Sequence, residues 1–301
     1  MSAKASVKVI IAALIGNAAI AVTKFAAAFA TGSSAMLSEG IHSLVDTGNQ
    51  VLLLYGMKQA KKPADEAFPF GHGKEVYFWS FVVAILIFAV GSGVSIYEGI
   101  IHLKHPVIIE NPMVNYIVLA CALVFEGAAW FFALKEFGKI KGKRGYIEAV
   151  HRGKDPSMFV VLFEDSAAML GLLVALAGIA LAQYTENPVF DGIASIAIGM
   201  ILGGTAIWLA IETKGLLIGE GADREVVQNI RDIVEAFDEV EKVNELLTMH
   251  MGPDFILVNI SIRFKRGRLT REIESVIQDI DTAIKQKHPL VKRIFVEAEP
   301  A

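Results

Sequence analysis

Residues 77–102 read YFWSFVVAILIFAVGSGVSIYEGIIH, and this stretch decides the fold. Its first 21 residues contain no Asp, Glu, Lys or Arg. A run of about 20 apolar residues is the length that crosses the hydrocarbon core of a bilayer as a helix. We therefore expect a membrane-spanning helix here.

Five more apolar runs bring the predicted number of spans to six. They cover residues 9–31, 35–57, 113–136, 157–183 and 189–213. The run at 35–57 is the weakest, because Glu39, His42 and Asp46 interrupt it. The first run continues past Lys24 to Ala30, so we expect a span rather than a cleavable signal peptide.

The composition excludes several classes of protein. Apolar residues make up 54% of the 301 residues and charged residues only 20%, against about 45–50% and about 25% in a soluble chain. We exclude a soluble enzyme, a nucleic-acid-binding domain and a disordered chain, and a net charge of −4 implies no nucleic-acid partner. The single cysteine, Cys121, excludes a disulfide framework and a cysteine-based zinc site within one chain.

The charges are unevenly distributed, which predicts two domains. Residues 216–301 hold 28 of the 60 charged residues, so we expect a transmembrane domain at 1–215 and a cytoplasmic domain at 216–301. Every second loop between spans is basic. The basic residues are Lys4 and Lys8, then Lys58, Lys61, Lys62 and Lys74, then Lys135, Lys139, Lys141, Lys143, Arg144, Arg152 and Lys154. This pattern predicts a multi-pass membrane protein with both termini in the cytoplasm, in the cell (inner) membrane if the source is prokaryotic.

The tail predicts a small α+β domain. Apolar residues recur at helix spacing in 226–237 and 273–284, and they alternate at strand spacing in 256–264. Further short strands are expected at 241–249 and 291–298. The order αββαβ suggests a ferredoxin-like plait that lacks its first strand. Such an open sheet favours a homodimer, with a monomeric cap as the alternative.

Ionisable residues within the spans indicate where function lies, because each costs about 2.5–3.5 kcal/mol to insert. His42 and Asp46 stand four residues apart and so share one helix face. Asp165 lies in the fifth span, with Glu164 beside it. An imidazole with two or three carboxylates suits tetrahedral Zn²⁺ or another borderline divalent metal, whereas carboxylates alone favour harder ions such as Mn²⁺. A purely structural polar network is the alternative reading.

Three more ionisable residues of the spans carry weaker expectations. Glu126 is a candidate partner for Lys24, although they lie in different spans. Asp191, near the end of the sixth span, is expected at the membrane interface.

Four short stretches carry a resemblance to a known family. They are SEGIHSLVD at 38–46, FPFGHGKE at 68–75, EDSAAMLG at 164–171 and DGIAS at 191–195. In this order, and with the predicted spans and tail, the chain resembles the cation diffusion facilitator family. Glu164-Asp165 and the stretch LIGE at 217–220 are similar to the branch that contains the mitochondrial zinc transporter homologues.

The resemblance implies a homodimeric secondary transporter, without enzymatic activity or a cofactor, that exchanges a divalent metal for protons. It assigns His42, Asp46 and Asp165 as metal ligands. The family's fourth ligand position falls on Val161, which cannot bind metal, so Glu164 and water are the candidates to replace it. We expect Zn²⁺ to be the transported ion, with Mn²⁺, Fe²⁺, Co²⁺ and Ni²⁺ as alternatives.

Other positions of the family pattern have changed in this chain. Asp65 matches the Asp of a peripheral metal site, but Phe68 stands where its His would be. The resemblance also implies that Lys74 takes part in a charge interlock at the dimer interface, for which Glu220 is a possible partner.

Two other functions remain as rivals at this point, an intramembrane metal-dependent hydrolase and a passive channel. The hydrolase normally needs a motif such as His-Glu-x-x-His, which the sequence lacks.

Overall fold

The computed structural model describes residues 3–109, 111–142 and 144–299, and the chain divides into two compact units. The first unit is built from the chain up to Gly56, from Phe78–His151 and from Pro156–Thr213. The second takes in Met57–Tyr77, Arg152–Asp155 and the chain from Lys214 onward. The second unit therefore contains two loops of the helical region in addition to the tail.

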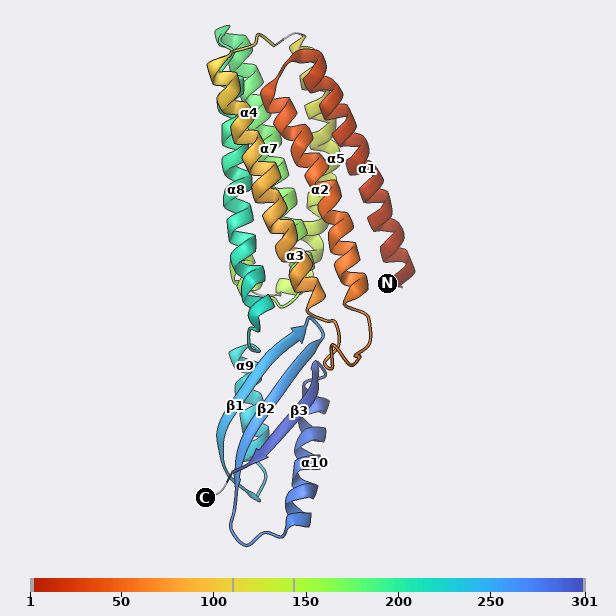
Figure 1. Ribbon diagram of the computed structural model, residues 1–301, viewed down its shortest axis with the longest axis vertical. Helices are drawn as coiled ribbons and strands as arrows, with labels where there is room; N and C mark the ends of the chain where they lie inside the picture. Colours follow the sequence, from red (N-terminus) through yellow and green to blue (C-terminus); the bar gives the residue numbers. More distant parts are fainter. Residues whose placement is uncertain (1–2, 110, 143, 300–301) are drawn as a thin grey trace. The chain divides into compact units, whose positions relative to one another are not determined.

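Helices form the first unit, and the long ones run side by side (Figure 1). They are α1 (Ala3–Thr31), α2 (Ser34–Gln59), α3 (Glu75–Leu86), η1 (Ile87–Ser92), α4 (Gly93–Lys104), α5 (Pro112–Lys141), α6 (Tyr146–Arg152), α7 (Pro156–Thr185) and α8 (Val189–Ile218). The elements α3, η1 and α4 follow one another without a break and make one helical segment.

Five of the described helical segments are long and apolar enough to cross a membrane, which fits a multi-pass membrane protein. They are Leu14–Thr31, Glu75–Lys104, Pro112–Lys139, Phe159–Thr185 and Val189–Ile218. Each overlaps a span that the sequence predicts. The helix α2, which carries the interrupting polar residues, is not among the five, so the sixth span remains a prediction.

Glycines allow the α4 and α8 helices to approach closely. A Cβ atom on Gly99 would lie 2.6 Å from Cγ1 of Ile196 and 2.8 Å from the carbonyl oxygen of Gly192. A Cβ atom on Gly199 would lie 2.6 Å from Cγ1 of Ile96. Small residues at helix contacts let backbones pack against one another where lipid supplies no hydrophobic driving force between helices.

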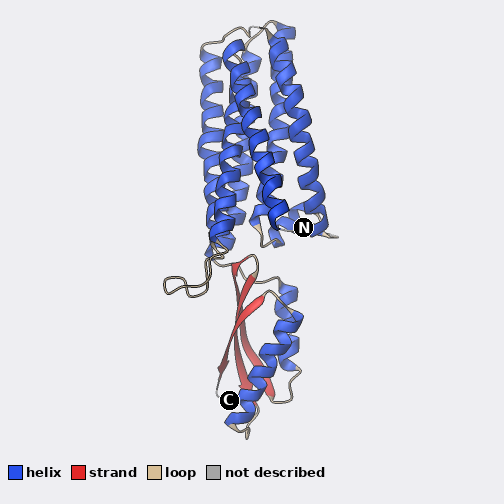
Figure 2. Ribbon diagram, turned by 90° about the vertical axis from the view of Figure 1, so that its right-hand side faces the viewer, coloured by secondary structure: helices blue, strands red, loops and turns tan. Residues whose placement is uncertain are grey.

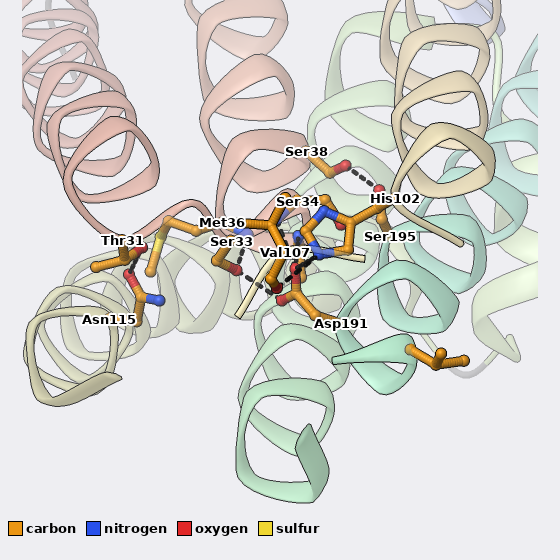
Figure 3. Close-up of polar contacts among 12 residues, drawn as sticks. Thr31, Ser33, Ser34, Met36, Ser38, His102, Val107, Asn115, Asp191 and Ser195 are labelled. Atoms are coloured by element: carbon orange, nitrogen blue, oxygen red, sulfur yellow. Dashed lines mark hydrogen bonds and ion pairs between the residues drawn. The ribbon is translucent and has the colours of Figure 1, made fainter. Parts of the chain in front are cut away.

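The start of α2 is capped by Asp191 of α8 (Figure 3). Asp191 is fully buried; its Oδ1 accepts a hydrogen bond from Ser33 Oγ at 2.6 Å, and its Oδ2 accepts one from the Ser34 N–H at 2.5 Å. The Ala35 N–H also donates to Oδ2, at 3.4 Å. The first N–H groups of a helix have no acceptors within the helix. Asp191, which belongs to another helix, supplies the acceptor oxygen for two of them. The structure thus gives Asp191 a capping role inside the protein, and its location at the membrane interface stays a prediction.

The second unit contains a three-stranded mixed sheet with two helices on one of its faces (Figure 2). Its elements are α9 (Arg224–Glu235), β1 (Val240–Gly252), β2 (Phe255–Phe264), α10 (Thr270–Lys287) and β3 (Val291–Ala298). The strand order is β1-β2-β3, with β1 antiparallel and β3 parallel to β2. The element order αββαβ is the predicted one.

Every second side chain of β2 points into the core of this unit. Val258, Ile260 and Ile262 are fully buried against the apolar stripes of the two helices. Those stripes contain Ile230 and Val234 of α9 and Val276, Ile280 and Ile284 of α10. Elsewhere on the sheet the side chains of Leu247 and Phe295 are exposed.

The loop between α2 and α3 is ordered by a pair that the sequence did not predict. Nε2 of His72 lies 2.9 Å from Oδ2 of Asp65, and this hydrogen bond holds the pKa of Asp65 below its ordinary value. The Phe68 N–H donates to the same carboxylate at 2.8 Å.

Glu220 forms its ion pair with Lys154, at 2.6 Å. The ammonium of Lys74, for which Glu220 was the expected partner, lies 3.8 Å from Sδ of Met249. Within this single chain the structure therefore gives Glu220 a different partner from the expected one.

We predict that Asp191→Ala lowers the thermal stability of the purified protein. The substitution leaves buried N–H groups at the start of α2 without an acceptor, which costs about 2 kcal/mol. Thermal unfolding in detergent measures the loss. Asp191→Asn is the matched control, because its amide oxygen still accepts one hydrogen bond, and its loss should be smaller. Equal melting temperatures for wild type and Asp191→Ala would contradict the capping role.

Candidate metal site

His42 and Asp46 meet on one face of α2. Nδ1 of His42 lies 3.1 Å from Oδ1 of Asp46, and the imidazole is 1% exposed. Among the described residues, neither ring nitrogen of His42 has a hydrogen-bond partner. A buried imidazole whose nitrogens make no hydrogen bond is free to bind a metal.

Glu164 of α7 is turned toward α2. Its side chain is buried, its Oε1 accepts a hydrogen bond from Asn49 Nδ2 at 2.6 Å, and its carboxyl group lies against that of Asp46. Asn49 was not among the residues predicted from the sequence, although it stands three residues after Asp46 and so lies on a neighbouring part of the same helix surface.

A cavity of about 410 Å³ opens between α1, α2, α5 and α7. Its lining residues are Asn17, Ser43, Asp46, Gln50, Glu126, Ala129, Phe132, Ala133, Val161, Asp165 and Ala168. Three of them carry carboxyl groups, and each of the three comes from a different helix: Asp46, Glu126 and Asp165. His42 and Glu164 do not line this cavity, so Asp46 belongs both to the cavity and to the group around His42.

A second polar cluster surrounds the ammonium group of Lys24. The side chain is fully buried, and Nζ lies 3.0 Å from Oε2 of Glu39, 2.8 Å from Oε1 of Glu126 and 2.8 Å from Oγ of Ser43. The predicted pairing of Lys24 with Glu126 is confirmed. Through these contacts α1 is joined to α2 and to α5.

The structure thus brings the four predicted ligands into neighbouring positions without closing them around one point. Among the residues that the structure describes, no three His, Cys, Asp or Glu side chains stand close enough to hold a metal ion as they are. Five carboxyl groups, those of Glu39, Asp46, Glu126, Glu164 and Asp165, share this interior with one ammonium group. One ammonium group cannot neutralise five carboxylates, and this excess of acidic groups favours the binding of a further cation or of protons.

Comparison with known proteins places the chain in a family. The family model described as "Cation efflux transmembrane domain" matches residues 10–218, and the one described as "Cation efflux protein, cytoplasmic domain" matches residues 222–301.

Three curated relatives illustrate the range of similar proteins. The mitochondrial proton-coupled zinc antiporter SLC30A9 of Xenopus laevis is 34% identical over 93% of this chain and 50% of its own length. Metal tolerance protein C4 of Arabidopsis thaliana is 30% identical over 80% of this chain and 52% of its own length. The manganese efflux system protein MneP of Bacillus subtilis is 22% identical over 97% of this chain and 95% of its own length.

The chain spans about half the length of the first two relatives. The family is named for an efflux activity, which is transport rather than enzymatic catalysis. Because the two family models together cover nearly all of its residues, the chain belongs to the cation efflux family.

Proposed function

We propose that the protein moves a divalent metal cation, Zn²⁺, across a membrane in exchange for protons by alternating access. The observation that carries this proposal is the carboxyl-lined cavity within the helical unit, with the imidazole of His42 beside it, 3.1 Å from Asp46 and without a hydrogen bond from either ring nitrogen to the described residues. The name of the Xenopus laevis relative, a proton-coupled zinc antiporter, supports the same function.

The metal is bound by His42, Asp46, Asp165 and Glu164. Metal binding requires a neutral imidazole and ionised carboxylates, so it releases the protons that the empty site holds. Protons that bind on the other side of the membrane then displace the metal. The close contact between the carboxyl groups of Asp46 and Glu164 favours this exchange, because two such groups share a proton more readily than they both ionise.

A movement of the helices closes these ligands around the ion. The described residues hold no completed metal group, and Asp46 and Asp165 come from different helices. A small shift of α7 against α2 changes their separation without unfolding either helix, as expected for rocking of a bundle about a central site.

The architecture that we propose has six spans, with α2 as the sixth. This helix has 26 residues and is therefore about 39 Å long, which exceeds the roughly 30 Å core of a bilayer. Lys24 offsets part of the cost of inserting Glu39.

We further propose a transmembrane domain at 1–215 and a cytoplasmic domain at 216–301 with a ferredoxin-like plait. The exposed apolar side chains of the sheet, such as Leu247 and Phe295, support a homodimer formed through this domain. Both termini lie in the cytoplasm, and the protein resides in the cell (inner) membrane if the source is prokaryotic.

Selectivity for another divalent metal is the alternative. The Bacillus subtilis relative is named for manganese efflux, and all the proposed ligands except His42 offer oxygen, which suits Mn²⁺. Fe²⁺, Co²⁺ and Ni²⁺ remain further alternatives for the transported metal, because the same ligands can bind them. Nitrogen from His42 favours Zn²⁺.

We predict that Asp46→Asn and Asp165→Asn each reduce zinc-dependent proton flux more than about 100-fold in sealed vesicles. Even residues that only hydrogen-bond to a metal ligand contribute roughly 10–100-fold, so a ligand should contribute more. Asp279→Asn, on the exposed surface of α10, is the matched control and should keep normal flux. Normal flux in either cavity variant, at equal protein levels, would exclude the proposed site.

We predict that His42→Asp shifts transport from Zn²⁺ toward Mn²⁺. The substitution removes the one nitrogen ligand and leaves only oxygen, which harder ions prefer. Transport of a panel of metals by wild type and variant measures the shift. An unchanged preference for zinc would show that His42 does not touch the ion.

We predict that Glu164→Gln weakens zinc binding about as much as Asp165→Asn does. Glutamine keeps an oxygen that accepts from Asn49 but loses the charge that the metal needs. Val161→His should partly rescue Glu164→Gln, because residue 161 lies one turn before Asp165 on the same face. Zinc titration of these variants is the measurement, and full-strength binding by Glu164→Gln would assign the fourth position to another group.

A further inference from the structure

Glu126 of α5 connects the two polar clusters of the helical unit. Its Oε1 accepts a hydrogen bond from Lys24 at 2.8 Å. Its Oε2 is buried and has no hydrogen-bond partner among the described residues. The same residue lines the cavity together with Asp46 and Asp165. One oxygen of Glu126 thus accepts a hydrogen bond in the Lys24 cluster, and the other makes no hydrogen bond to the described residues.

The charges around Lys24 do not balance. Its three N–H groups are used by Glu39, Ser43 and Glu126, so one ammonium faces two carboxylates. When both are ionised, one negative charge is left without a partner, and such a charge is costly in a buried position. Of the two carboxylates only Glu126 lines the cavity, so this is where an additional cation can neutralise the excess.

We propose that Glu126 is a further ligand of the transported cation, and that Lys24 is the resident cation with which the metal competes for it. This inference rests on the proposed function and deepens it, because it adds a binding residue to the same site and names what controls its affinity. The ion then has a position on the cavity side, between Asp46, Asp165 and Glu126. The helix movement then brings His42 and Glu164 to the same ion.

The arrangement of the cavity supports this assignment. Asp46, Glu126 and Asp165 lie on three helices and are close enough to influence one another electrostatically in all three pairs. Val161, one turn before Asp165, also lines the cavity but offers no donor atom. Glu126 therefore adds an oxygen from α5 on the cavity side of the ion, where Val161 offers none.

Lys24 can release Glu126 without being left unpaired. After such a release its ammonium keeps Glu39 at 3.0 Å and Ser43 at 2.8 Å as acceptors. The cluster therefore has two neutralised arrangements, one with Lys24 and one with a metal ion on Glu126. The alternative is that Glu126 serves only as a structural counter-ion of Lys24.

Zinc titration of the purified full chain, comparing Glu126→Gln with Glu39→Gln, separates these two roles. Both substitutions remove one negative charge from the same ammonium, and both keep an oxygen that can accept its hydrogen bond. We expect the Kd for zinc to rise by roughly tenfold or more in Glu126→Gln, the range seen when groups next to a metal are removed. The rise should be smaller in Glu39→Gln, which removes no ligand but leaves Glu126 as the one carboxylate beside Lys24. Equal changes in the two variants would overturn the inference.

Asp46→Asn, titrated in parallel, distinguishes failure of this inference from failure of the proposed function. Weak binding by Asp46→Asn together with normal binding by Glu126→Gln overturns the role of Glu126 alone. Normal binding by both overturns the proposed site itself.

A second measurement keeps the test decisive if Glu126→Gln does not fold. The double variant Lys24→Gln/Glu39→Gln removes the competing ammonium together with its other carboxylate and leaves Glu126 intact. Competition predicts that this variant binds zinc more tightly than wild type. In a double variant that melts at the wild-type temperature, unchanged or weaker binding contradicts the competition.

Discussion

The buried ammonium group of Lys24 is the interaction on which the helical unit depends. It ties α1 to α2 through Glu39 and Ser43 and to α5 through Glu126, and its three donors are all used. Removing such a group from water is costly, and its two carboxylate partners offset that cost. Because Glu39 stands three residues before His42, the contact also fixes the rotation of α2 and therefore the direction in which His42 and Asp46 point.

Asp46 belongs both to the group of residues around His42 and to the lining of the cavity. On one side it meets His42 at 3.1 Å and the carboxyl group of Glu164. On the other it lines the cavity with Asp165 and Glu126. In the function that we propose, the excess of carboxyl groups over cations holds protons when no metal is bound and so couples metal movement to proton movement in the opposite direction.

Patterns within one helix or strand predicted much of this structure. Apolar runs located the long helices, strand alternation located β2, and the four-residue spacing of His42 and Asp46 placed both on one face, where the structure pairs them. Contacts between different helices could not be predicted, because they depend on how each helix is rotated and packed. The cap that Asp191 gives to α2, the turn of Glu164 toward Asn49 and the pairing of Glu220 with Lys154 are of this kind.

Coupled movement of metal and protons is the central claim, and one measurement tests it directly. The purified protein is placed in sealed vesicles with equal zinc on both sides, and a pH gradient is imposed. The account predicts that zinc accumulates on the acidic side against its own gradient and that a protonophore abolishes the accumulation. Zinc that stays at equal concentration on both sides, or that equilibrates without moving protons, would contradict the account.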